Sequence, residues 1–170
     1  MLFRSQTNII NTALSGLRLA GRLQEIHIGA RWLLDVAHNP AAAKVLGEAL
    51  RGESHDGGTV AIVAMLDDKD VRGCIAQLQD QVDQWIAVTA ASPRAIDADE
   101  LARQVANASN RACLVADSVD AAVARAEELT RAGDRVLVTG SFYLVGPVLD
   151  LLSERYGGRP GRAIRAQGRV

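Results

Sequence analysis

Four short polar segments of the sequence carry side chains that could bind an anionic small molecule. Each follows a run of apolar residues and precedes a segment with helical spacing. The segments are DVAHNP at residues 35–40, LDDKD at 66–70, ASPR at 91–94 and TGSFY at 139–143. Together they supply imidazole, ammonium, guanidinium and hydroxyl donors and one carboxylate acceptor, a set suited to phosphate or carboxylate groups.

The first segment places Asp35 and His38 beside the start of a helix. Asn39 is a favourable N-cap and Pro40 suits the first helical position, and the free amides and dipole at a helix amino terminus attract anions. An aspartate that ends a strand can accept hydrogen bonds from a ribose hydroxyl, and a histidine can contact phosphate or carboxylate. The alternative is that Asp35 only caps the turn and His38 is solvated.

The other three segments each offer one further candidate. Lys69 lies at the start of a helix capped by Asp68 or Asp70, where the helix dipole disfavours a cation unless an anion is bound. Arg94 could hold a carboxylate through two hydrogen bonds. Ser141 could contact a ligand. Their alternatives are a solvated lysine, an arginine without a specific partner and a serine that only caps the next helix.

The elements that position these segments alternate along the chain. Short apolar runs that indicate strands occupy residues 32–36, 60–64, 85–89, 113–115 and 135–139, with a further edge strand at 23–28. Helical spacing of apolar residues occurs at 41–50, 71–82, 97–106, 118–131 and 145–156. Alternating strands and helices predict an α/β fold, an open and mostly parallel sheet with helices on both faces. Ligands of such sheets bind outside the carboxyl ends of the strands, where all four polar segments are expected.

Composition excludes several classes of protein. The 170 residues carry 19 basic and 20 acidic side chains and are 48% hydrophobic, which is typical of a globular domain and argues against nucleic-acid and membrane partners. No apolar run has the ~20 residues of a membrane span, and no secretory signal is recognisable. Cys74 and Cys113 match no redox or zinc spacing, which predicts reduced thiols in a cytoplasmic protein. A monomer is expected.

Complete catalytic motifs are missing from the sequence. It contains no GxxxxGK[ST] phosphate loop, no GxGxxG turn, no GxSxG elbow and no HExxH. No cluster of residues has the spacing of a metal site, so we expect no metal ligands in this chain. The polar segments alone therefore predict half of a ligand site.

The same four segments, in this order and spacing, resemble bacterial folylpolyglutamate synthase/dihydrofolate synthase, a family of Mur-ligase-like ATP-dependent amide ligases. The stretch GRLQ at 21–24 is similar to the GRFQ segment that opens the carboxyl-terminal domain of that family. The resemblance covers about residues 9–156. It departs at Tyr143-Leu144, where family members often have His-Thr, so no role is carried over to position 143.

The resemblance implies a Rossmann-like sheet of about six strands and a role for each matching residue. Arg22 and Asp35 match positions that contact ATP. His38, Lys69 and Ser141 match positions near the glutamate and the transferred phosphate, with His38 and Lys69 as the expected catalytic residues. Arg94 resembles the arginine of related Mur ligases that holds the amino-acid carboxylate. The substrates implied are L-glutamate with dihydropteroate or folate. The phosphate loop, the magnesium ligands and the pterin site are expected in a preceding domain.

These matches divide the chain into three parts. Residues 1–20 are expected to be the last helix of the preceding ATPase domain or to be foreign to it, 21–156 the Mur-ligase-like domain, and 157–170 a basic Gly/Arg tail without fixed structure. We expect such a carboxyl-terminal fragment to be inactive alone. The alternatives are a stand-alone Rossmann-like nucleotide-binding module, a Mur peptidoglycan ligase domain, and a flavodoxin-like protein, which would need Ser and Thr residues after its first strand.

Overall fold

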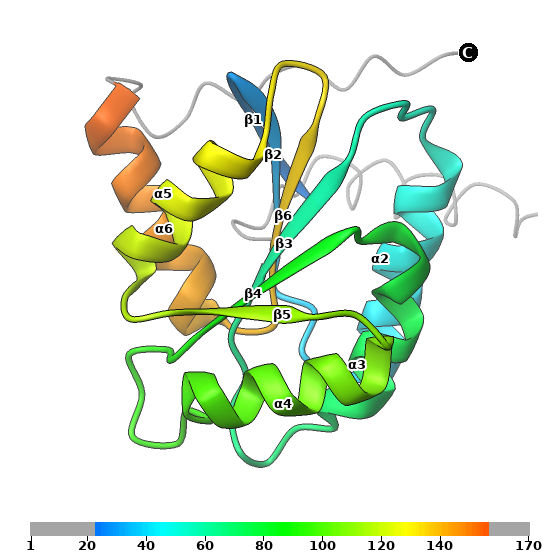
Figure 1. The fold of residues 1–170 in the computed structure, drawn as a ribbon, viewed down its shortest axis with the longest axis vertical. Coiled ribbons are helices and arrows are strands. Elements are labelled where there is room, and N and C mark those ends of the chain that lie inside the picture. Colours follow the sequence, from blue (N-terminus) through cyan, green and yellow to red (C-terminus); the bar gives the residue numbers. More distant parts are fainter. Residues whose placement is uncertain (1–22, 157–170) are drawn as a thin grey trace, which may run out of the picture.

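A computed structural model describes residues 23–156 of the chain, and within them six strands form one sheet (Figure 1). The strands are β1 (Gln24–Ile28), β2 (Ala30–Asp35), β3 (Thr59–Val63), β4 (Gln84–Val88), β5 (Cys113–Ala116) and β6 (Arg135–Thr139). Their order across the sheet is β1-β2-β6-β3-β4-β5. The edge strand β1 pairs antiparallel with β2, and all other pairs are parallel. The predicted open, mostly parallel sheet of six strands is therefore confirmed.

Helices cover both faces of this sheet, as the alternating pattern predicts. They are α2 (Pro40–Gly52), α3 (Val71–Leu78), the short 3-10 helix η1 (Gln79–Gln81), α4 (Ala98–Ser109), α5 (Val119–Leu129) and α6 (Phe142–Tyr156). Helices α2, α3 and α4 lie on one face, and α5 and α6 lie on the other (Figure 1). None of the helices between residues 23 and 156 is both long and apolar enough to cross a membrane.

The two faces explain why the strands are continuously apolar. In β3, Val60 and Ile62 pack under α5 and α6, whereas Ala61 and Val63 pack under α2 and α3. Every residue of β3 and of β6 is buried, so neither face of these central strands tolerates polar alternation.

Side-chain caps fix where several helices begin. Asn39 accepts a hydrogen bond from the amide of Ala42 at 2.9 Å, Asp70 from Gly73 at 2.8 Å, and Ser118 from Ala121 at 3.1 Å. Each satisfies an amide that has no partner within its helix. Of the two aspartates that the sequence offers as the cap of α3, Asp70 is the one that caps it. The Asp68 carboxylate is therefore available for other contacts.

Every predicted helix differs from the observed one by at least one residue, and two of these differences have a clear cause. The helix expected over 71–82 ends at Leu78 and tightens into η1, because Val82 turns to an extended conformation and is buried in the core below β4. The helix expected from Val145 begins at Phe142, because the Ser141 carbonyl accepts the amides of Leu144 and Val145 at 3.1 and 3.0 Å.

Both cysteines carry free thiols. Burial raises the pKa of Cys74 and of Cys113 to about 11. Both thiols therefore stay protonated near neutral pH, which makes them poor nucleophiles and poor metal ligands.

Gly140, directly after β6, is required by the turn that it forms. Its φ of +107° lies in the region that favours glycine, and a β-carbon here would lie 2.4 Å from the carbonyl oxygen of Ala64. The chain can therefore leave β6 so close to the end of β3 only without a side chain.

Replacement of Gly140 by alanine is expected to lower the free energy of unfolding by about 2 kcal/mol or more, because backbone strain and a clash with rigid backbone add. Urea unfolding of the chain measures the change. The matched control is Gly146→Ala in α6, where a β-carbon meets no atom within 4 Å and the helix should be unchanged or slightly more stable. Equal stability of both variants would contradict the required close approach.

Candidate functional site

A hollow lies at the carboxyl ends of β2, β6 and β3, where neighbouring loops diverge. The loops after β2 and β3 lead to α2 and α3 on one face, whereas the loop after β6 leads to α6 on the other (Figure 1). Adjacent parallel strands whose connections leave on opposite faces open a crevice at their carboxyl ends. The residues lining this space, the carboxyl-edge hollow, are His38, Leu66, Lys69, Gly140, Ser141, Phe142 and Tyr143. Three predicted site residues, from three separate loops, are thus brought together.

His38 is held in one orientation by the backbone. Its Nδ1 lies 2.8 Å from the carbonyl oxygen of Val36. A carbonyl only accepts, so Nδ1 carries the hydrogen of this bond and Nε2 is the nitrogen left for a ligand. A neutral His38 therefore offers a lone pair at Nε2, and a protonated one offers a donor there.

Lys69 is paired with the carboxylate next to it in the sequence. Its Nζ donates to Asp68 Oδ2 at 2.7 Å, and Asp68 Oδ1 lies 3.8 Å from Arg94 Nη1. The hydrogen bond from Lys69 is the largest cause that holds the pKa of Asp68 below its ordinary value. Asp68 thus joins two predicted carboxylate-binding cations, a role that sequence reasoning missed because it treated this aspartate only as a possible helix cap.

Backbone hydrogen bonds tie the loops that carry these two cations. The amide of Asp67 donates to the carbonyl of Arg94, and the amide of Ile96 donates to that of Met65, each at 2.9 Å. Between them, Leu66 and Ala95 form an antiparallel bridge. Arg94 itself is 59% exposed and does not line the carboxyl-edge hollow, so the structure places it beside the hollow rather than in it.

Ser141 and the two aromatic residues after it form the α6 side of the hollow. Ser141 is buried, and its Oγ accepts the amide of Tyr143 at 3.2 Å, which confirms a capping contact. Phe142 and Tyr143 are 60% and 49% exposed in the first turn of α6. Both aromatic side chains line the carboxyl-edge hollow. In the sequence, only their position directly after a strand pointed to Phe142 and Tyr143 as residues of the site.

Asp35 closes the turn after β2. Its Oδ1 accepts the amide of Ala37 at 2.8 Å and its Oδ2 accepts the amide of Leu23 at 3.0 Å. Asp35 therefore does cap this turn, as the alternative interpretation of the sequence held. The expected contact of Asp35 with ATP remains a prediction. Arg22, the other residue expected at ATP, lies outside the described residues.

No metal centre is formed within the part of the chain that the structure covers. Residues 23–156 bring together no group of three or more His, Cys, Asp or Glu side chains that could hold an ion. The donors around the carboxyl-edge hollow are mainly imidazole, ammonium and hydroxyl groups, which suit an anion rather than a cation.

Comparison with known families gives a match over most of the chain. Residues 21–142 match the family described as Mur ligase, glutamate ligase domain. Among curated proteins, the chain is 35% identical over 151 residues to the dihydrofolate synthase/folylpolyglutamate synthase of Escherichia coli (strain K12). This match takes in 89% of the chain but only 35% of the relative, so the chain spans about a third of the relative's length.

Solved structures give the same result for the fold. Escherichia coli FolC in complex with DHPP and ADP matches with a TM-score of 0.78 and 33% identity, over 87% of this chain and 34% of that one. A bifunctional folylpolyglutamate synthase/dihydrofolate synthase with Mn, AMPPNP and L-glutamate bound matches with a TM-score of 0.73 and 34% identity, over 81% and 32%. Both agree with the resemblance seen in the four polar segments.

The pairing of Asp68 with Lys69 predicts a measurable titration. The Asp68 carboxyl should titrate below its ordinary pKa of 3.8, because Lys69 and Arg94 favour its charged form. Carbon-detected NMR of the chain measures this pKa, which should return toward 3.8 in Lys69→Met. The matched control Lys44→Met, at an exposed residue of α2, should leave it unchanged. A pKa of Asp68 that is indifferent to Lys69 would contradict the pairing.

Proposed function

The chain belongs to the family of Mur ligase glutamate ligase domains, and from this premise we propose that it is the carboxyl-terminal domain of an ATP-dependent ligase that joins L-glutamate to dihydropteroate or folate. The relatives described above are folate ligases, which supports this substrate class over peptidoglycan precursors. The complementary two thirds of such a ligase would bind the pterin and the phosphates of ATP.

The observation that carries the proposal is the meeting of His38, Lys69 and Ser141 at one hollow. In the proposed reaction an oxygen of the substrate carboxylate attacks the γ-phosphorus of ATP, the bond from that phosphorus to the β,γ-bridging oxygen breaks, and ADP leaves an acyl phosphate behind. The glutamate amine then attacks the acyl carbon, the C–N bond forms, the C–O bond to phosphate breaks, and the nitrogen loses a proton.

Each residue at the hollow has a part that its geometry allows. Lys69, with Arg94 beside it, would hold a glutamate carboxylate by charge-assisted hydrogen bonds. Nε2 of His38, which is not used by the bond to Val36, would face the amine or the departing phosphate, where it can accept or donate a proton. Ser141, at the start of α6, would add a hydroxyl contact.

ATP and a divalent cation enter this proposal through the relatives. Solved structures of the family contain ADP, or AMPPNP with Mn. We propose that Arg22 and Asp35 contact ATP in this chain, and that the ligands of the cation, expected to be Mg²⁺, belong to the complementary domain. A monomer in the cytoplasm also remains a prediction.

An acyl phosphate hydrolyses readily, which gives this domain a second task. Closure of one domain over the other would exclude water from the intermediate and bring the cations of this chain to the reacting groups. The isolated chain therefore should turn over no dihydropteroate, ATP or glutamate.

A hybrid enzyme tests the proposal, with residues 21–156 in place of the matching third of the Escherichia coli relative. Steady-state kinetics should show glutamate-dependent ligation, and Lys69→Ala should raise the KM for glutamate by about tenfold to a hundredfold through loss of one charge-assisted contact. The KM for ATP should stay nearly constant. The matched control Lys44→Ala, at an exposed residue of α2, should leave both constants unchanged.

Two outcomes would contradict the proposed function. One is a folded hybrid that binds ATP but forms no glutamate adduct, which would favour a nucleotide-binding module without catalysis. The other is an effect of Lys69→Ala on the KM for ATP alone, which would remove Lys69 from the glutamate site.

A further inference from the structure

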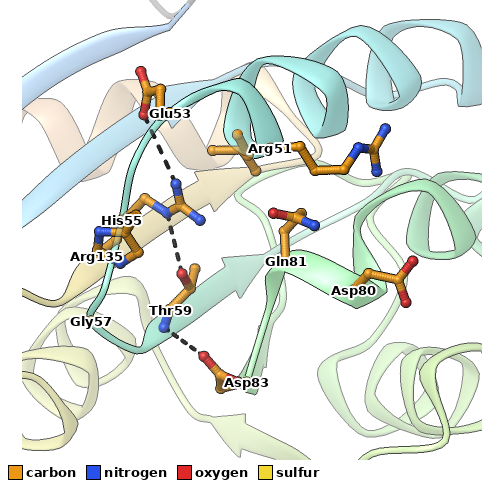
Figure 2. Close-up of a pocket in the computed structure, with 10 residues that line it drawn as sticks. Arg51, Glu53, His55, Gly57, Thr59, Asp80, Gln81, Asp83 and Arg135 are labelled. Carbon is orange, nitrogen blue, oxygen red and sulfur yellow. Dashed lines mark hydrogen bonds and ion pairs between the residues drawn. The ribbon is translucent and has the colours of Figure 1, made fainter.

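A second hollow lies at the opposite edge of the sheet, at the amino-terminal ends of β3 and β6 and the end of α2 (Figure 2). Its wall includes Arg135, Thr59, Glu53, Gln81 and Asp83, and we call it the amino-edge hollow. It shares no residue with the carboxyl-edge hollow, so the proposed ligase function makes no use of it.

Arg135 is an incompletely paired guanidinium at the base of this hollow. Its side chain is only 3% exposed, its Nε donates to Thr59 Oγ1 at 3.2 Å, and its Nη1 is buried without a hydrogen-bond partner. A buried donor without an acceptor is costly, and more so when it is charged. Burial is the largest cause that lowers the pKa of Arg135, so the neighbouring carboxylates do not fully offset its desolvation.

The carboxylates around Arg135 are largely committed elsewhere. Glu53 Oε2 lies 3.9 Å from Arg135 Nη1 but accepts a 2.8 Å hydrogen bond from Arg31. Asp83 accepts the amide of Thr59, and Asp134 accepts the amide of Gly58, each at 2.9 Å. These bonds leave the outer nitrogens of Arg135 without a carboxylate at hydrogen-bond distance among residues 23–156.

Among the side chains that line the hollow, Arg135 and Gln81 carry groups that can donate hydrogen bonds to a small anion. Figure 2 shows the guanidinium of Arg135 directed into the hollow toward Gln81, whereas the ends of Arg51 and Asp80 are directed away from it. We propose that the amino-edge hollow binds the carboxylate group of a small organic acid, with Arg135 as the anchor. The Gln81 amide, whose oxygen faces Arg135 in Figure 2, becomes a second donor when a half-turn of its amide group brings the nitrogen to the ligand. The planar fork of a guanidinium matches a carboxylate.

The acidic residues nearby decide between carboxylate and phosphate. Glu53 and Asp83 border the hollow, and their charges repel a doubly charged phosphate more than a singly charged carboxylate. A bound carboxylate would supply the acceptor that Glu53, 3.9 Å from Arg135 Nη1, does not provide, while Glu53 keeps its bond to Arg31.

Titration of the ¹⁵N-labelled 170-residue chain with sodium acetate, at constant ionic strength against sodium chloride, tests the site. The amides of Thr59 and Gln81 and the Nε–H of Arg135 should shift saturably, with a dissociation constant on the order of millimolar. Arg135→Lys should weaken binding about tenfold, because a lysine loses the paired contact. The matched control Arg103→Lys, on exposed α4, should bind as wild type.

Two further variants and a second anion complete the test. If Arg135→Lys does not fold, Gln81→Ala should still fold and weaken acetate binding severalfold. Lys69→Ala should leave the shifts at Thr59 and Gln81 unchanged, because that residue belongs to the other edge of the sheet. Absence of saturable acetate shifts, or retained affinity in both variants, would overturn the site. Tighter binding of inorganic phosphate than of acetate would overturn the assignment to a carboxylate.

Discussion

The direction in which the chain leaves three adjacent strands governs the rest of this structure. Strands β2, β6 and β3 are hydrogen-bonded neighbours, yet β6 sends its helix to the face opposite to the helices that follow β2 and β3. The divergence is sterically possible because Gly140 passes the backbone of Ala64 without a side chain. The same turn buries Ser141 and starts α6, so the fold creates the carboxyl-edge hollow and fixes its wall at once.

The charged and polar groups at this hollow are held by contacts within the domain. Lys69 precedes α3, where the helix dipole disfavours a cation, and Asp68 offsets that cost. Nδ1 of His38 is hydrogen-bonded to the backbone carbonyl of Val36, so Nε2 is the nitrogen that remains for a ligand. A bound anion would compete with Asp68 for Lys69, which links ligand binding to a local rearrangement of charge.

Sequence patterns predicted the sheet and helices well because both faces of the sheet are buried, so that apolar runs and helical spacing are unambiguous. They also selected His38, Lys69 and Ser141, since parallel strands bring their carboxyl ends to one edge. Asp68 was missed as a partner of Lys69, because its contact depends on which aspartate caps α3. Arg135 was missed because it opens the apolar strand β6, and nothing in the local sequence shows that its side chain is buried. Arg22 and the segments 1–20 and 157–170 lie outside the described residues. The contact of Arg22 with ATP and the division of the chain at these segments therefore remain predictions.

The central claim is that the hollow between β2, β6 and β3 holds the glutamate of a ligase reaction. A crystal structure of the hybrid enzyme with L-glutamate and AMPPNP would test it most directly. A glutamate carboxylate should lie at hydrogen-bond distance from Lys69 Nζ, with the amine facing His38 Nε2. Glutamate bound elsewhere, with Lys69 still paired to Asp68 and the hollow empty, would contradict the claim.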